Sequence, residues 1–168
     1  MKDTIVNKMS KKHLVDFFII IFIFLIDRAS KLLIISSPET YEKYGISVTS
    51  FLNFNLIWNE GVAFGLFSFN DKLYYNLLTI FICIITAVII WLMFRSKRFE
   101  KFSYLMIIGG SFGNIFDRVF YSAVPDFIDI HINNFHWFIF NVADIFITLG
   151  IFCLIMLEIL SKKKDEAR

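Results

Sequence analysis

The sequence predicts an all-α membrane protein that crosses the bilayer four times. Apolar residues make up 57% of the 168 residues, and 22 of them are Phe, more than a water-soluble domain carries. The chain also contains four apolar stretches close to the 20 or so residues that a helix needs to cross the hydrocarbon core. Its basic residues gather on one side of these stretches. The length suits one domain, which we take as residues 1–168.

The four expected spans are residues 14–35, 73–94, 102–120 and 142–160. The second span contains no charged residue, whereas the other three are interrupted, mainly near one end. These interruptions are Asp16, Asp27, Arg28 and Lys31 in the first span, Asp117 and Arg118 in the third, and Asp144 and Glu158 in the fourth. No small-residue cleavage pattern follows the first span, so we interpret it as an uncleaved anchor.

The orientation follows from the basic residues that flank the spans. Residues 2–12, 95–101 and 162–168 each contain four Lys or Arg residues, which together are 12 of the 17 in the chain. The segments 36–72 and 121–141 contain only Lys43 and Lys72. Because basic flanks stay in the cytoplasm, both termini are expected there.

The two outer segments are expected to contain strands. Val48–Phe69 is rich in residues that favour strands, with a turn at 59–61. In the second segment, apolar residues alternate with polar ones from Ile128 to Asn133, which is the period of a short strand, and Asn133-Asn134 predicts a turn. A sheet edge cannot face lipid, so these strands are expected at the membrane interface or on the helix bundle.

Polar residues from several spans converge at one level of the membrane. A rise of about 1.5 Å per residue places Asp27 roughly 20 Å from the inner face. The same counting places six further polar residues in the outer part of the membrane. They are Lys31, Asn114, Asp117, Arg118, Asp126 and Asp144. Ionisable residues inside a membrane are costly and normally line a bundle interior or a cavity, so the cluster predicts a functional site.

Each of these residues also has a structural interpretation. The alternatives are an i,i+4 ion pair for Asp27 and Lys31, a capping box for Asn141 and Asp144, an interfacial position for Arg118, and close helix packing for Gly109 and Gly113. Their convergence at one depth favours the functional interpretation.

The residue types restrict the chemistry of this site. The layer contains no Ser/His/Asp or Cys/His set, so acyl-enzyme chemistry is not expected. His131 and His136 lie near Asp126 and Asp129, but their spacing matches no zinc motif, and we assign neither a metal nor a cofactor. Asp126 and Asp144 remain as the reactive pair. Two carboxylates held close together share a proton, as in aspartic peptidases.

Four blocks of sequence resemble the lipoprotein signal peptidases, the type II signal peptidases of bacteria. They are Asp27-Arg28-Ala29-Ser30-Lys31, Asn59-Glu60-Gly61-Val62-Ala63-Phe64, the run from Gly109 to Arg118 that contains Asn114-Ile115-Phe116-Asp117, and the pair Val124-Pro125-Asp126-Phe127 and Phe140-Asn141-Val142-Ala143-Asp144. The blocks occur in the family's order on a four-span topology.

The resemblance implies an endopeptidase that uses Asp126 and Asp144 as its catalytic pair. It implies supporting or substrate-binding roles for Asp27, Lys31, Asn59, Gly61, Asn114, Asp117, Arg118, Asn141 and Ala143. It also implies four transmembrane helices with a small extracytoplasmic β-cradle built from Val48–Phe69.

The same resemblance implies the substrate and the location. The substrate would be a prolipoprotein whose Cys carries diacylglycerol, cut before that Cys. We expect a monomer in the bacterial cytoplasmic membrane, with its active site near the outer face, membrane lipids around it and no nucleic-acid partner. Phe64, Phe67 and Phe69 are candidates for a lipid-facing wall.

A small four-helix membrane carrier with intramembrane carboxylates is the alternative function. Carriers place their sites near the midplane, with access from both sides. Here the charges gather at the outer level and the span 73–94 has none, which favours the peptidase.

Overall fold

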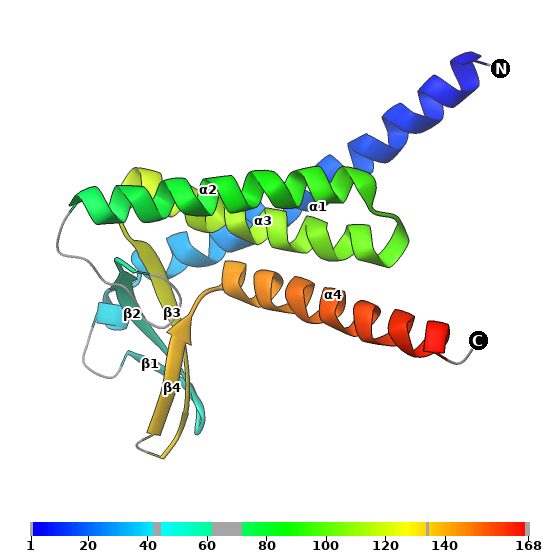
Figure 1. The fold of residues 1–168 in the computed structure, drawn as a ribbon. Helices are drawn as coiled ribbons and strands as arrows, with labels where there is room; N and C mark the ends of the chain where they lie inside the picture. Colours follow the sequence, from blue (N-terminus) through cyan, green and yellow to red (C-terminus); the bar gives the residue numbers. More distant parts are fainter. Residues whose placement is uncertain (1, 42–44, 62–71, 134, 167–168) are drawn as a thin grey trace.

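A bundle of four helices and a four-stranded sheet make up the protein (Figure 1). The computed structural model describes residues 2–41, 45–61, 72–133 and 135–166. The helices are α1 (Lys2–Ile35), α2 (Lys72–Arg95), α3 (Arg98–Tyr121) and α4 (Val142–Glu166), and a short 3₁₀ helix, η1 (Pro38–Tyr41), follows α1. The strands are β1 (Ile46–Thr49), β2 (Leu52–Asn59), β3 (Val124–Ile132) and β4 (Phe135–Phe140).

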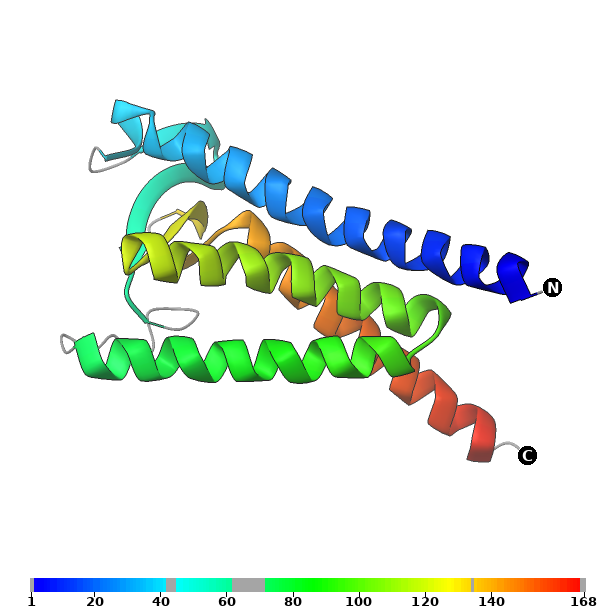
Figure 2. The same cartoon turned by 90° about the horizontal axis from the view of Figure 1, so that it is seen from above.

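The helices alternate in direction along the bundle. Figures 1 and 2 show the N-terminal end of α1, the α2–α3 connection and the C-terminal end of α4 at one end, and the sheet at the other. The described parts of the three basic segments therefore lie at the end of the bundle opposite the sheet.

Two helices are long and apolar enough to cross a membrane, judged by length and composition. They are α2 over Tyr75–Arg95 and α4 over Val142–Lys162, and only 11% of the most apolar stretch of each is buried. The core helix of a soluble protein would be mostly buried, so these exposed faces fit a lipid environment. The expected spans 14–35 and 102–120 also coincide with helices, α1 and α3, but over their described residues these two do not meet the same criterion. Four transmembrane helices therefore remain a prediction.

The sheet is antiparallel, with the strand order β1-β2-β3-β4. The sequence predicted a cradle built from Val48–Phe69. The observed sheet is larger, because β3 and β4 supply half of its strands. Alternation around Ile128–Ile132 indicated one short strand, whereas β3 begins at Val124 and pairs with both β2 and β4. The residues from Val62 to Phe69, including Phe64, Phe67 and Phe69, lie outside the described residues, as does Asn134 of the expected turn.

An apolar cluster attaches the sheet to the end of the bundle. Ile34 of α1, Leu56 of β2 and Phe127 of β3 are buried together. Phe54 meets Phe127 edge to face, with ring centroids 6.0 Å apart. Burying each such side chain contributes about 1.5–3 kcal/mol. This packing fixes β3 relative to the helices and so sets the position of Asp126.

Glycines let α3 lie close to both α1 and α4. A Cβ atom on Gly109 would be 2.8 Å from the Cβ of Ile23, and one on Gly110 would be 2.5 Å from the carbonyl oxygen of Ala143. The Gly109 contact confirms close helix packing at the first glycine of the Gly-x-x-x-Gly pattern, and small residues at such positions allow this approach.

A buried ion pair joins α1 to α3 on the helix segments away from the sheet. The Lys101 ammonium donates to Asp16 Oδ2, and the two residues are only 7% and 8% exposed. This pairing explains how Asp16 is accommodated in an apolar stretch, because a buried charge needs a partner.

We expect Asp16→Leu to lower the free energy of unfolding by about 3 kcal/mol, because it leaves the Lys101 charge buried without its carboxylate. The double variant Asp16→Leu/Lys101→Met should recover most of this loss. Thermal unfolding in detergent measures both. Glu158→Gln, in the exposed Glu158–Lys162 pair, is the control and should change nothing measurable. Equal unfolding midpoints for Asp16→Leu and the wild type would contradict this account.

Candidate active site

Asp126 and Asp144 are joined through one residue, Asn141, where the bundle meets the sheet. The Asn141 side-chain amide donates to Asp126 Oδ1 at 2.6 Å, and its backbone N–H donates to Asp144 Oδ2 at 3.1 Å. The backbone N–H of Asp144 donates in return to Asn141 Oδ1 at 3.1 Å. This reciprocal pair is the capping box predicted at the start of α4. The helix cap therefore also positions both carboxylates.

Two further asparagines fix the remaining carboxylate oxygens. Asn59 Nδ2 donates to Asp126 Oδ2 at 2.8 Å, and Asn114 Nδ2 donates to Asp144 Oδ1 at 2.8 Å. Asn59 Oδ1 accepts the backbone N–H of Gly61 at 2.8 Å, which orients its amide group. Each of the four carboxylate oxygens thus has a neutral N–H donor. Such donors orient the carboxylates without neutralising their charge.

Beneath the aspartates, Lys31 forms the centre of a hydrogen-bonded network. Its side chain is fully buried, and its Nζ donates to Asp27 Oδ2 at 2.8 Å, Asn114 Oδ1 at 2.9 Å and Asp117 Oδ2 at 2.7 Å. An ammonium has three protons, so its donors are fully used. Because Asn114 accepts from Lys31 through oxygen, its nitrogen is directed to Asp144. The predicted i,i+4 ion pair of Asp27 and Lys31 is confirmed within this larger network.

Asp27 also contacts the beginning of α4. Its Oδ1 accepts the backbone N–H of Ala143 at 2.9 Å, which connects α1 to the turn that holds the capping box. A Cβ atom on Gly113 would collide with Asp27 Oδ2. The second glycine of the Gly-x-x-x-Gly pattern therefore leaves room for a charged side chain, a role that the sequence pattern alone did not indicate.

Arg28 is a site residue that the sequence analysis did not include. Its Nη2 lies 2.6 Å from Asp117 Oδ1, and its guanidinium lies 4.9 Å from the ring centroid of Phe116. With Lys31, Arg28 balances the formal charges of Asp27 and Asp117. The sequence signal that could have indicated Arg28 is a second cation, one helical turn before Lys31, within an apolar stretch.

Arg118 is buried inside the protein and does not extend to its surface. It is 7% exposed, and its Nη1 and Nη2 donate to the carbonyl oxygens of Asn114 and Gly61, both at 3.1 Å. It therefore ties the end of α3 to the segment that follows β2. Gly61 serves the site through its backbone, donating to Asn59 and accepting from Arg118.

The electrostatic environment favours a proton on this pair of aspartates. Asp126 is 4% exposed, and burial, followed by the charge of Asp144, raises its pKa from 3.8 to about 6. The hydrogen bonds from Asn59 and Asn141 oppose this rise in the pKa without cancelling it. Two adjacent carboxylates do not both ionise readily, so the pair can present one acid and one base near neutral pH.

The family model described as signal peptidase (SPase) II matches residues 19–160. The chain belongs to the signal peptidase II family. A lipoprotein signal peptidase of Pelagibacter ubique is 47% identical over 163 residues, which cover 95% of this chain and 98% of that protein. One of Blochmanniella pennsylvanica is 41% identical, covering 86% of this chain and 88% of that protein.

Solved structures of bacterial membrane enzymes share the fold of this signal peptidase II. One superimposes with a TM-score of 0.69 at 27% identity and covers 90% of each chain. A second superimposes with a TM-score of 0.66 at 26% identity, covering 85% of this chain and 91% of the other. The protein is thus a membrane enzyme of bacterial type, and its relatives do not favour the carrier alternative.

All of the predicted site residues lie in one connected region. The described structure brings Asp126 and Asp144 together with the supporting residues Asp27, Lys31, Asn59, Gly61, Asn114, Asp117, Arg118, Asn141 and Ala143. They come from three helices, two strands, the segment after β2 and the residue between β4 and α4, Asn141. No single stretch of sequence contains the site.

Proposed function

We propose that Asp126 and Asp144 are the catalytic pair of this signal peptidase II. The enzyme is a protease that removes signal peptides from prolipoproteins. The observation that carries the catalytic assignment is the shared partner Asn141, which holds both carboxylates where β3 meets the first turn of α4.

The proposed reaction needs no covalent intermediate. One carboxylate removes a proton from a water molecule as the water oxygen attacks the carbonyl carbon of the scissile peptide. The other, protonated, carboxyl group donates a hydrogen bond and then its proton to the carbonyl oxygen. Collapse of the tetrahedral intermediate breaks the C–N bond, and the leaving nitrogen takes a proton from the pair.

The supporting residues act through position and charge. Lys31 and Asn114 orient Asp144, and Asn59 orients Asp126. Since a misplacement of about 1 Å can lower a rate about a hundredfold, these contacts matter without touching the substrate. Arg28 and Asp117 complete the charge balance around Lys31.

The diacylglyceryl anchor of the substrate would position the scissile peptide bond beside the aspartates. Each buried CH₂ contributes about 0.8 kcal/mol to membrane binding, so two acyl chains hold the cleavage site at a defined depth in the leaflet. An anchored peptide is held beside the aspartates in one orientation, whereas an unanchored peptide would reach them only by rare encounters from solution. Cleavage before the lipidated Cys would follow from this placement.

The topology that fits this function has four spans and both termini in the cytoplasm. The site lies at the sheet end of the bundle, opposite the basic segments (Figure 1). With those segments inside, the aspartates lie near the outer face of the cytoplasmic membrane, where lipidated precursors are anchored. We expect the enzyme to work as a monomer, because the network that holds both aspartates comes from one chain.

Asp126→Asn and Asp144→Asn should each reduce cleavage of a lipidated precursor at least a thousandfold, because the pair then has only one titratable carboxyl group. Each purified variant is assayed in lipid, and its unfolding midpoint confirms that it is folded. Glu158→Gln, an exposed change on α4, should retain wild-type turnover. Near-normal turnover in either aspartate variant would refute the catalytic pair.

The cleavage rate should follow a bell-shaped dependence on pH. Below both apparent pKa values of the pair there is no base, and above both there is no acid. Because the raised pKa of Asp126 lets it keep its proton up to about pH 6, the alkaline limb should lie at or above pH 6. Rates measured from pH 3 to 10 test this, and an alkaline limb centred below pH 5 would contradict it.

Reporter fusions test the topology independently of activity. A reporter joined after Ser96 or after Ser161 should report the cytoplasm, because basic residues flank both positions. A reporter joined after Ser50, between β1 and β2, should report the outer side. An outer-side signal from the Ser96 fusion would exclude the four-span arrangement.

A further inference from the structure

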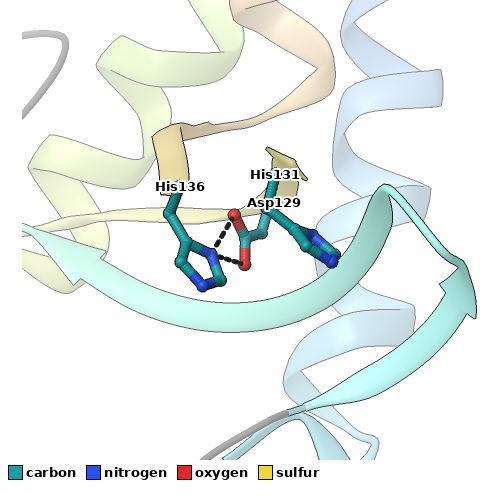
Figure 3. Close-up of side chains that lie close together, drawn as sticks. All are labelled: Asp129, His131 and His136. Atoms are coloured by element: carbon teal, nitrogen blue, oxygen red, sulfur yellow. Dashed lines mark hydrogen bonds and ion pairs between the residues drawn. The ribbon is translucent and has the colours of Figure 1, made fainter. Parts of the chain in front are cut away.

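A second cluster of polar residues lies on the sheet, away from the aspartate pair. Asp129 and His131 project from β3 and His136 from β4, and the three side chains gather together (Figure 3). Successive side chains of a strand point to opposite faces, so Asp126 and Asp129 lie on opposite faces of β3. This cluster is therefore separate from the site described above.

Strand pairing brings the three side chains together. His131 pairs directly with His136, and their rings stack with centroids 5.1 Å apart. His136 Nδ1 lies 2.8 Å and 3.0 Å from the two oxygens of Asp129. One possible ligand atom from each residue lies within 4.8 Å of the others. These separations approach the spacing of about 3.3 Å between ligands that Zn–N and Zn–O bonds of about 2.0–2.1 Å imply for a tetrahedral ion.

Two buried polar atoms beside the cluster have unmet bonding capacity. Among the described residues, His131 Nδ1 and Asn53 Oδ1 are buried and have no hydrogen-bond partner. Asn53 stands directly opposite Asp129 on the neighbouring strand, and Asp129 is only 2% exposed. Buried polar atoms are normally satisfied, so a nitrogen and an oxygen lone pair here indicate a bound group. The His136 side chain is 53% exposed, which leaves a path from solvent.

We infer that Asp129, His131 and His136 bind one divalent transition-metal ion, with zinc the best match. Two imidazoles and one carboxylate are a common protein ligand set for Zn²⁺, with water in the fourth position. Asn53 Oδ1, which belongs to the residue paired with Asp129 and has no partner among the described residues, would be available to accept a hydrogen bond from that water. The positive charge of the ion would also compensate the negative charge of the buried Asp129 carboxylate.

The expected effect of the ion is to stiffen the β3–β4 hairpin. Asp129 and His131 come from one strand and His136 from the other, and the pairing register slips between Asp129 and His131. A metal bound across this irregularity would pin the two strands where their hydrogen bonding is interrupted. The site takes no part in the proposed peptide cleavage.

Zinc titration of the tag-free protein in detergent tests this inference. We expect one Zn²⁺ per chain by calorimetry, a higher unfolding midpoint with Zn²⁺, and visible absorption bands of a tetrahedral complex with Co²⁺. His131→Gln and His136→Gln should each weaken Zn²⁺ binding at least tenfold and remove the Co²⁺ bands. Circular dichroism without metal verifies that each variant is folded.

The third histidine of the chain provides a matched control. His13 Nδ1 also lies near a carboxylate, 3.6 Å from Asp16 Oδ2, but among the described residues the two belong to no group of three possible ligands. His13→Gln should bind Zn²⁺ with wild-type affinity. Unchanged binding in His136→Gln, loss of binding in His13→Gln, or an absence of stoichiometric Zn²⁺ binding by the wild type would each overturn the inference. None of these results depends on peptidase activity.

Discussion

The buried ammonium group of Lys31 is the interaction on which the rest of the site depends. It lies in an apolar bundle without solvent exposure, and its three protons bond to Asp27, Asn114 and Asp117. An uncompensated charge at this position would cost several kcal/mol, so the surrounding acceptors are needed for folding as well as for positioning. Through Asn114 the ammonium orients one aspartate. Through Asp27 it connects to the backbone of the turn that begins at Asn141, and Asn141 donates to the other aspartate, Asp126.

The site separates two kinds of charge. Around Lys31, cations and anions balance, with Arg28 and Asp117 completing the set. In the described structure, the hydrogen-bond donors to Asp126 and Asp144 are neutral amides, and the nearby cations Lys31 and Arg118 donate to neither carboxylate. The balanced charges around Lys31 hold that group in place. The two adjacent carboxylates of Asp126 and Asp144 instead favour retention of a proton by one of them. The proposed acid and base roles of the pair need such an environment, because a cation bonded directly to either carboxylate would favour loss of the shared proton.

The sheet contributes more than a cover over the bundle. It carries Asp126 on β3 and Asn59 at the end of β2, and the Ile34–Leu56–Phe127 cluster holds both strands against α1. The opposite face of β3 carries the histidine cluster. β3 thus presents the proposed catalytic carboxylate on one face and two of the three proposed metal ligands on the other, which its regular alternation makes possible.

The sequence by itself determined the helical bundle and the capping box, because these depend on local signals. The predicted site residues came from the depth of the charged residues in the apolar stretches and from the four blocks that resemble the family. Apolar stretches, i,i+4 spacing and Asn-x-x-Asp at a helix start can be recognised in the chain itself. Only the tertiary structure decided that Arg28 pairs with Asp117, that Gly113 makes room for Asp27, and that His131 meets His136. These contacts join segments far apart in sequence or across strands, and their distances depend on packing and strand register, which spacing along the chain does not define.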